Sequence, residues 1–285
     1  MKVILKNLLI IAGSISSLSG EEHPLDDWTL KGPFPTLKSL DSLTSGDGVV
    51  VVAFWNEEGE ALVKENDGPF VLESLGLPEV SRVSGVCYRN GTWLAIQSGQ
   101  VFVKQSWEGP WMKTGPANLK FAQSFSTENY FWLSTSGEYT GFFLNPRWIN
   151  KRHFRSRDGI TWEEFSITED PEVPFSIGDI QEGAGHFVAV NASVGETAGI
   201  WQSADGLSWS RIETIFKGYQ TLDFGNGRFV AGGPTGTVAI SDDGIVWDFP
   251  RFPIVEDVFG NGISFAARYS SANQITFYDG QFYAL

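Results

Sequence analysis

The stretch that decides the fold is Ser241-Asp-Asp-Gly-Ile-Val-Trp247, SDDGIVW, because its pattern, S-x-D-G-x-x-W, occurs three times in the 285-residue chain. Two close copies precede it, SRDGITW at 156–162 and SADGLSW at 203–209. Neighbouring carboxylates beside a glycine would suit a calcium site or acid–base chemistry, but one active site does not usually occur in triplicate. A motif repeated in this way predicts a structural unit that the chain uses several times.

Each residue type of the motif S-x-D-G-x-x-W suits a tight hairpin turn. The Asp carboxylate can accept hydrogen bonds from backbone N–H groups of its own turn, Ser can add a local bond, and Gly permits a positive φ. The Trp can then bury its indole and find a partner for its N–H. Calcium needs more oxygen ligands than one carboxylate per turn, so we expect no metal site. We predict a purely structural role for Ser156, Asp158, Gly159, Trp162, Ser203, Asp205, Gly206, Trp209, Ser241, Asp243, Gly244 and Trp247.

A second pattern, a Gly or Asn turn followed by an apolar strand, recurs in register with the first. It reads GAGHFVAVN at 183–191, GNGRFVAGG at 225–233 and GNGISFAAR at 260–268, with weaker versions at 46–54, 89–97 and 127–135. Each unit of about 40 residues has four short strands separated by turns, which is typical of a propeller blade. We therefore predict an all-β fold, a six-bladed β-propeller of four-stranded antiparallel blades, with five or seven blades as alternatives.

The N-terminal sequence predicts export and ring closure. Lys2 and Lys6 accompany a short apolar run at 8–12 and then small residues, the layout of a signal peptide over 1–20. We expect one propeller domain over 21–285, secreted or periplasmic. Residues 28–30, within DDWTLKGPF, resemble the fourth strand of other units, so we predict that they complete the last blade and remove an exposed sheet edge.

Composition narrows the partners. The aromatic share of 14%, with 32 Gly and 13 Pro, favours many short strands joined by turns. The formal charge of −14 argues against nucleic acid and anionic lipid, which both need clustered cations. Cys87 is the single cysteine, which excludes an intrachain disulfide and favours a buried thiol. We expect no cofactor, no membrane insertion and a monomer.

The repeated motif, with a degenerate SWEGPW at 106–111, resembles the Asp-box (BNR) repeat of sialidase-like propellers in a short variant. That family includes sialidases and also non-enzymatic members such as sortilin-type receptors and photosystem II assembly factors. The resemblance implies a propeller over most of the chain, with binding or glycoside hydrolysis as its function. A sialidase would need three arginines around the substrate carboxylate and a Tyr–Glu pair, and its Phe/Tyr-Arg-Ile-Pro motif is absent here. The available residues are Arg82, Arg147, Arg155, Arg268, Tyr269 and Glu256.

Function is expected at the end of the blades away from the repeated turns. In a four-stranded meander the 2-to-3 loops and blade connections lie at that end, and loops on a rigid scaffold usually carry binding. The loop STSGEYTGFFLNPRWINKRHF at 134–154 is unusually long and combines aromatics with Arg and Asn, which suit a sugar ring or a peptide. The alternative is a lid whose aromatics fold back over the blade edge. We predict ligand contacts from Tyr139, Arg147, Trp148, Asn150 and Arg152.

Polar residues before each innermost strand should ring the channel mouth. Ser42 and Asp179 belong to this set, and we predict ligand contacts from Arg82, Gln123 and Thr221. Glycoside hydrolysis needs two carboxylates about 5 to 10 Å apart, and Asp179 with Glu256 is the pair to test. The sequence thus predicts a secreted binding or scaffold module for carbohydrate, peptide or protein, with a sialidase-like exo-glycosidase as the alternative.

Overall fold

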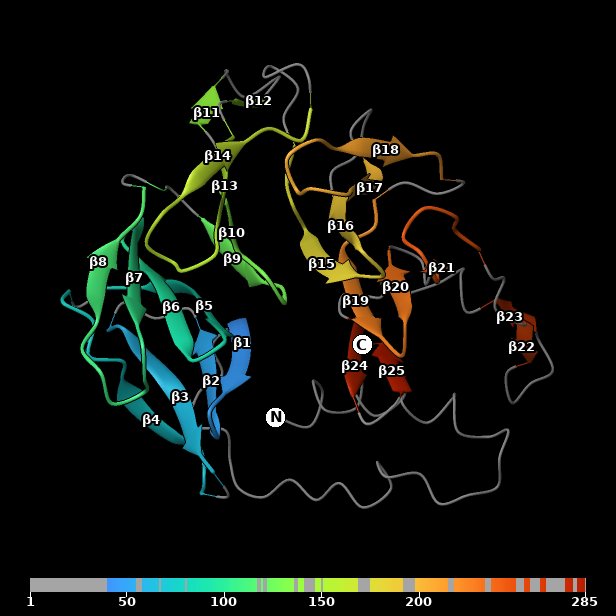
Figure 1. Cartoon of the computed structure of the whole chain (residues 1–285). Helices are drawn as coiled ribbons and strands as arrows, with labels where there is room; N and C mark the ends of the chain where they lie inside the picture. The colour runs from blue at the N-terminus through green and yellow to red at the C-terminus, as the bar shows by residue number, and fades with distance from the viewer. Residues whose placement is uncertain are drawn as a thin grey trace. The chain divides into compact units, whose positions relative to one another are not determined.

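All regular structure in the described part of this computed structural model is β-strand (Figure 1), which confirms the all-β prediction. The chain forms two compact units that divide after Ser176. No helix among the described residues could span a membrane. The predicted signal peptide and the predicted closing strand at 28–30 lie outside the described residues, which are 40–54, 58–66, 68–79, 81–116, 119, 122–135, 138–140, 147–149, 151–168, 175–191, 198–214, 218–233, 237–249, 254–256, 262–264, 275–278 and 281–284.

The N-terminal unit contains three four-stranded antiparallel sheets, here called blades 1 to 3. Blade 1 consists of β1 (Leu40–Gly46), β2 (Val49–Phe54), β3 (Glu60–Glu65) and β4 (Val71–Ser74). Blade 2 consists of β5 (Val83–Arg89), β6 (Thr92–Gln97), β7 (Gln100–Lys104) and β8 (Met112–Thr114). Blade 3 consists of β9 (Gln123–Ser126), β10 (Phe131–Ser134), β13 (His153–Ser156) and β14 (Glu163–Phe165), and a separate hairpin of β11 (Glu138–Thr140) and β12 (Arg147–Ile149) interrupts it.

The C-terminal unit contains two further blades. Blade 4 consists of β15 (Asp179–Gly183), β16 (His186–Asn191), β17 (Gly199–Ser203) and β18 (Ser210–Ile212). Blade 5 consists of β19 (Thr221–Gly225), β20 (Arg228–Gly232) and β21 (Val238–Ser241), and a bridge between Ile240 and Asp248 takes the place of a fourth strand. Two strand pairs follow, β22 (Ile254–Glu256) with β23 (Gly262–Ser264), and β24 (Ile275–Tyr278) with β25 (Gln281–Ala284).

The sixth unit differs from its prediction. The sequence analysis places its first turn and the following strand at 260–268, whereas the strand next to β19 is β24. The Ile275 N–H donates to Thr221 Oγ1 at 2.8 Å, and the Phe277 N–H donates to Asp223 Oδ2 at 2.6 Å. Sequence similarity explains the error, because GNG at 260–262 imitates a first-hairpin turn while YDGQF at 278–282 holds that position. The described residues therefore give five blades followed by the β22–β23 and β24–β25 pairs, of which β24–β25 adjoins blade 5.

The core lies between blades, because each blade is a single sheet that can bury a face only against its neighbour. Within each unit the first strands of successive blades are adjacent, β1 with β5, β5 with β9, β15 with β19 and β19 with β24. Trp93 and Val51 belong to the cluster between blades 1 and 2, Phe131 and Val103 to the one between blades 2 and 3, and Phe229 to the one between blades 4 and 5. Burial of each such side chain stabilises the fold by about 1.5–3 kcal/mol.

Candidate functional site

The three Ser-x-Asp-Gly turns close through local hydrogen bonds. At the first turn, Asp158 Oδ1 accepts the backbone N–H of Ile160 and of Thr161, both at 2.8 Å. Ser156 Oγ accepts the Gly159 N–H at 2.8 Å and donates to Asp158 Oδ1 at 3.0 Å. Burial alone would raise the pKa of Asp158, but these backbone N–H donors and the Ser156 hydroxyl lower it below the usual carboxyl range.

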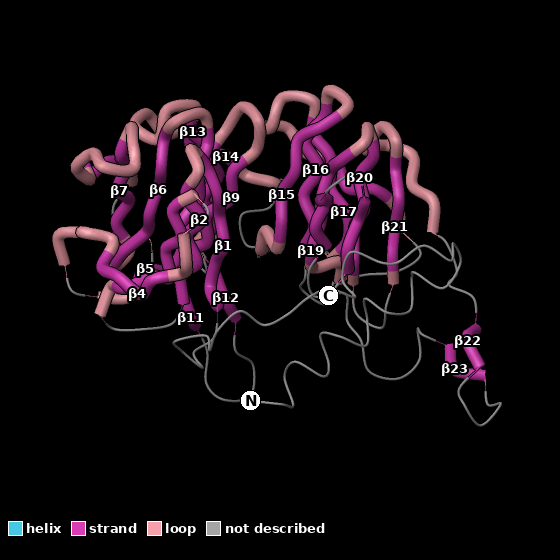
Figure 2. The backbone as a smooth tube through the Cα atoms, turned by 90° about the horizontal axis from the view of Figure 1, so that it is seen from below, coloured by secondary structure: helices cyan, strands magenta, loops and turns pink. Residues whose placement is uncertain are grey.

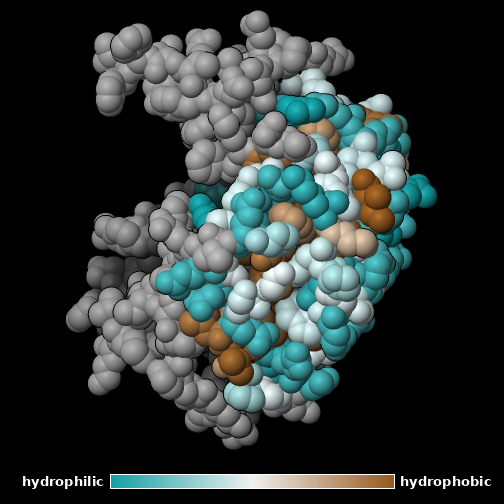
Figure 3. All heavy atoms as spheres, turned by 90° about the vertical axis from the view of Figure 1, so that its left-hand side faces the viewer, coloured by the Kyte–Doolittle hydropathy of each residue, from teal (hydrophilic) through white to brown (hydrophobic). Residues whose placement is uncertain are grey.

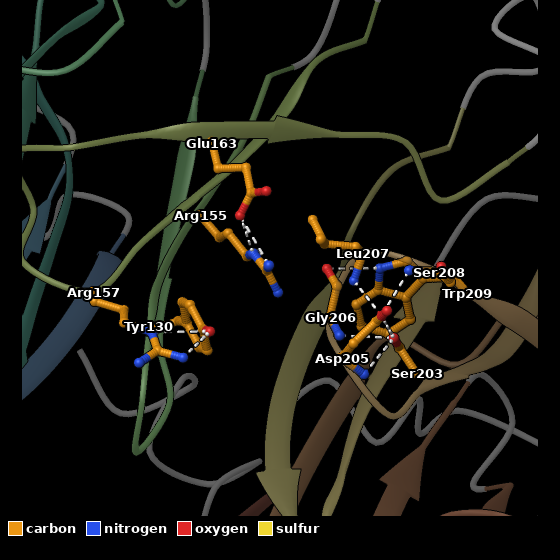
Figure 4. Close-up of polar contacts among 10 residues, drawn as sticks. All are labelled: Tyr130, Arg155, Arg157, Glu163, Ser203, Asp205, Gly206, Leu207, Ser208 and Trp209. Carbon is orange, nitrogen blue, oxygen red and sulfur yellow. Dashed lines mark hydrogen bonds and ion pairs between the residues drawn. The ribbon is translucent and has the colours of Figure 1, made fainter.

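The same bonds recur at 203–209 and 241–247, and Figure 4 shows the copy around Asp205. Each indole N–H donates to the carbonyl of the motif glycine, at 3.0 Å for Trp162 and 3.2 Å for Trp209 and Trp247. The carboxylates are thus engaged within their own turns. In the described part of the chain, no group of three or more His, Cys, Asp or Glu side chains could hold a metal ion.

In blade 2, a lysine and two tryptophans occupy the turn that the Ser-x-Asp-Gly motif occupies in blades 3 to 5. Lys104 faces Trp93 in the strand ladder as Ser156 faces Phe131 in blade 3. Its buried ammonium group donates to the Trp107 carbonyl at 2.5 Å and lies 3.6 Å and 4.7 Å from the ring centroids of Trp107 and Trp111. Burial lowers the pKa of Lys104 to about 8, although Glu108 and Glu73 oppose the shift. Two aromatic rings and a cation therefore replace the Asp–Ser pair.

Three first strands, β1, β15 and β19, carry a recurring pattern that the sequence analysis missed: two polar residues two positions apart, followed two positions later by Gly. In β1 the pattern is Ser42, Thr44 and Gly46, and the hydroxyls accept the N–H of Val86 at 3.0 Å and of Tyr88 at 3.1 Å in the next blade. In β15, Asp179 Oδ2 accepts the Leu222 N–H at 3.0 Å and Gln181 Nε2 donates to the Leu222 carbonyl at 3.3 Å. Thr221 and Asp223 of β19 bond β24 in the same way. We call this arrangement the blade joint.

The glycine of each joint makes room for an aromatic ring of the next blade. A Cβ atom on Gly183 would lie 2.5 Å from ring carbons of Phe224. The corresponding distances are 2.1 Å from Gly46 to Tyr88 and 2.1 Å from Gly225 to Phe277. The joint could have been found in the sequence as a Gly four residues after a polar residue, followed about 40 to 50 residues later by an aromatic at a matching position.

Three residues predicted to ring the channel mouth belong to blade joints. Thr221 is buried, and Ser42 and Asp179 each accept a backbone N–H from the next blade. Burial raises the pKa of Asp179 to about 7, the N–H groups of Leu222 and Ile180 oppose that shift, and the charge of Asp223 adds to it. Asp223 is therefore the carboxylate that the structure places beside Asp179, and the sequence analysis did not single it out.

The other predicted residues are more dispersed. Glu256 ends β22 and its side chain is outside the described residues, so its pairing with Asp179 stays a prediction. Arg82 precedes β5 and is partly exposed, and Gln123 begins β9, opposite Ser134, and is exposed. Arg155 is buried, and its Nε and Nη2 donate to Glu163 Oε2 at 2.9 Å and 2.8 Å (Figure 4). The Arg147 side chain, Arg268 and Tyr269 lie outside the described residues, so a sialidase-like arginine cluster stays a prediction.

The long segment at 134–154 contains a β-hairpin rather than only a loop. In the β11–β12 ladder, Tyr139 is opposite Trp148 and Thr140 is opposite Arg147. The hairpin lies between β10 and β13, at the end of blade 3 away from the 156–162 turn (Figure 2). Asn150 is outside the described residues. Arg152 follows the hairpin and binds both carboxylate oxygens of Glu164 at 2.7 Å, with half of its side chain exposed.

Two open hollows adjoin the turn end of the blades. One, of about 560 Å³, lies over blade 5 beside Arg228, Asp242, Asp248 and Phe249. The other, of about 350 Å³, lies between blades 2 and 3 beside Pro116, Trp162 and Glu164. Neither hollow includes a residue that we predicted to contact a ligand.

Comparison with known proteins supports the fold alone. No family model matches the chain, and no curated protein matches it. The solved structure "YCF48 bound to D1 peptide" has a TM-score of 0.50 and 13% identity, over 75% of this chain and 67% of that one. An ancestral GH74 enzyme has a TM-score of 0.57 and 11% identity, over 76% of this chain and 32% of that enzyme. The extracellular domain of a putative one-component system from B. thetaiotaomicron has a TM-score of 0.56 and 9% identity, over 86% of this chain and 31% of that domain. The match to this chain spans about a third of the length of each of the last two structures. The chain therefore has a β-propeller fold.

Proposed function

We propose that this protein is a secreted or periplasmic binding module that contacts its ligand through the end of the propeller opposite the Ser-x-Asp-Gly turns. The observation that carries the proposal is the β11–β12 hairpin, which is inserted between the second and third strands of blade 3. Among the described residues, no other blade has a strand between its second and third strands. Insertions on a rigid scaffold are the common place for recognition. Carbohydrate, peptide and protein are the ligand classes that the aromatic and Arg content of this segment suits.

The architecture that we propose is a six-bladed Asp-box propeller that acts as a monomer. Support comes from the three identical turns and from the β24–β25 pair, which bonds β19 as the first strands of a further blade would. The structure "YCF48 bound to D1 peptide" is a precedent for peptide binding by this fold. A fold alone does not determine function, so the ligand must be found by experiment.

The test is a binding screen of the full chain on glycan and peptide microarrays, followed by titration of each hit. The double variant Arg147→Ala/Trp148→Ala should weaken binding at least tenfold while the melting temperature stays unchanged. The matched control is Ile245→Ala/Val246→Ala, two exposed residues of a Ser-x-Asp-Gly turn, which should bind normally. Normal binding by the hairpin variant would refute the assignment, and a large fall in its melting temperature would identify the hairpin as a structural lid.

The alternative is a sialidase-like exo-glycosidase. One observation favours it: Asp179 has a raised pKa and an acidic neighbour, as general acids often do. Turnover of fluorogenic sialosides or other aryl glycosides by the full chain would support this alternative if it were lost in Asp179→Asn. An inactive wild-type chain would leave the binding module as the better account.

A further inference from the structure

The outermost strand of blade 1 leaves a backbone edge open. Within the described part of this sheet, β4 pairs with β3 alone. The Leu75 N–H donates to the Gly59 carbonyl at 3.4 Å. Alternate residues of an antiparallel strand direct their backbone groups to the same side, so the N–H and C=O groups of residues 75, 73 and 71 face β3. Phe70, Leu72 and Ser74 must therefore direct their N–H and C=O groups away from the sheet. A strand edge of this kind is a template for pairing with another segment.

The side chains on this edge are unusually apolar. Phe70 is 42% exposed, Val71 51% and Leu72 37%. The other described fourth strands, β8, β14 and β18, contain no run of consecutive exposed apolar residues. Figure 3 shows apolar patches among hydrophilic surface on the side of the N-terminal unit where β4 and β8 lie. Consecutive exposed apolar residues beside free backbone groups are typical of an interaction edge.

The charge around this edge is negative. The described residues between 58 and 79 include five glutamates, at 58, 60, 65, 73 and 79, against a single basic residue, Lys64. Glu73 belongs to β4 itself, and Glu108 of the next blade acts with it on the charge of Lys104. An occupant of this edge should therefore be cationic, since a second acidic segment would be repelled.

We propose that β4 binds an extended polypeptide segment in which apolar residues alternate with Lys or Arg, added to blade 1 as a fifth strand. The outward backbone groups of Phe70, Leu72 and Ser74 supply the hydrogen bonds. Side chains alternate along a strand, so the apolar side chains of the segment cover Phe70 and Leu72 on one face of the sheet, while its cations lie on the other face, with Val71 and Glu73. Its cations pair with Glu73 and the surrounding glutamates. Strand addition of this kind takes affinity from the backbone and specificity from alternate side chains.

A second copy of this chain fits the edge less well. Two β4 strands side by side would bring two Glu73 carboxylates and two acidic surroundings together, and like charges across a strand pair are destabilising. The proposed site is also on a different blade from the β11–β12 hairpin. The two proposals can therefore fail independently.

The probe is a fluorescein-labelled peptide, KVRVKVRVK, titrated with the full chain and followed by anisotropy. Two N-methylated isomers test the geometry, one methylated at odd and one at even positions. Because a strand directs alternate N–H groups to opposite sides, one isomer should lose binding at least tenfold and the other should keep it. A block peptide of the same composition, KKKRRVVVV, should bind at least tenfold more weakly, and added salt should weaken the parent peptide.

Matched protein variants locate the site. Val71→Lys should lose at least tenfold in affinity, whereas Met112→Lys, which replaces a similarly exposed residue (46%) on β8, should stay within twofold. Leu72→Pro removes an outward N–H and should also abolish binding, and circular dichroism shows whether each variant is folded. If Leu72→Pro fails to fold, the comparison of Val71→Lys with Met112→Lys still shows whether the peptide binds at β4.

Several results would overturn the proposal. These are equal binding of both N-methylated isomers, equal binding of the block peptide, normal binding by Val71→Lys, or no binding of the parent peptide. Hydrogen exchange of the free chain gives an independent check, because the amides of Leu72 and Ser74 should exchange rapidly. Slow exchange that is independent of protein concentration would mean that the chain's own residues cover the edge, and slow exchange that increases with concentration would mean that a second copy does.

Discussion

Replacing Gly183 with alanine tests the blade joint between blades 4 and 5. The new methyl group would lie 2.5 Å from three ring carbons of Phe224, about 1 Å inside ordinary contact. The ring cannot retreat easily, because its centroid is 4.6 Å from that of Phe229, which is fully buried. Overpacking costs about 1–3 kcal/mol, and we take the upper end because the ring is held. The lower chain entropy of alanine returns about 0.5–1 kcal/mol. We expect a net loss of about 2 kcal/mol in the free energy of unfolding.

Urea unfolding followed by tryptophan fluorescence measures this loss, and Gly185→Ala is the control. Gly185 lies two residues away in the following turn, has a φ of +78° and has open space where its Cβ would be. It should lose only about 1 kcal/mol, through its left-handed backbone. A control loss as large as that of Gly183→Ala would mean that an added methyl group in this hairpin costs the same with or without a facing ring.

The double variant Gly183→Ala/Phe224→Ala isolates the contact. Phe224→Ala alone should cost about 2 kcal/mol, because the ring is only partly buried. With the ring gone, the added methyl has room, so the double variant should lose about 2 kcal/mol rather than the additive 4 or so. Additive losses within about 0.5 kcal/mol would refute the idea that the glycine is required by the ring of the next blade.

Substitutions at two further residues, Asp158 and Asp179, test the polar groups. Asp158→Ala removes two backbone bonds at 2.8 Å from an exposed turn and should cost about 1–2 kcal/mol in urea unfolding at pH 7, with Asp158→Asn costing less. Because the folded-state pKa of Asp158 is lowered, this stabilisation exists above the ordinary carboxyl pKa and should fade as pH falls below about 4; an equal cost at pH 3 and pH 7 would contradict it. The stability contributed by Asp179 changes with pH in the opposite direction. Its folded-state pKa is raised to about 7, so the protonated carboxyl stabilises the fold fully in acid, and this stabilisation is lost as pH rises through about 7. Asp179→Asn should flatten the dependence of stability on pH between about 4 and 7, the range between the unfolded-state and folded-state pKa values, and an unchanged slope would mean that other groups cause it.

Local chemistry explains what the sequence could predict. The bonds of a Ser-x-Asp-Gly turn join residues two or three positions apart, so seven letters suffice to foresee the hairpin. The four-stranded blades followed from the same local signals. The β24–β25 pair was misplaced because two similar Gly-containing turns compete for one place, and only the bonds to β19 decide between them.

The blade joint could not be foreseen in the same way. Asp179 and Leu222 are 43 positions apart, and nothing in either residue alone indicates the other. Thr221 was therefore predicted to be a ligand contact although its hydroxyl bonds the next strand. The hairpin inside 134–154 escaped prediction because GFFLNP at 141–146 has no Asn-Gly or Asp-Gly signal to mark its turn.

The blade joint also has a direction. In all three joints the residue with a short side chain belongs to the earlier blade, and the backbone partner and the aromatic ring belong to the later one. A blade that takes part in two joints, as blade 5 does, therefore presents two different sides to its neighbours, and a contact of this type is heterologous in the sense used for oligomers. Such a contact is not self-complementary, so two identical end blades cannot satisfy each other across a two-fold axis. In a series of such joints, one side of the first blade and one side of the last blade stay without a partner until these two blades meet. Joints of this kind therefore favour a closed ring within one chain, as head-to-tail contacts favour cyclic oligomers.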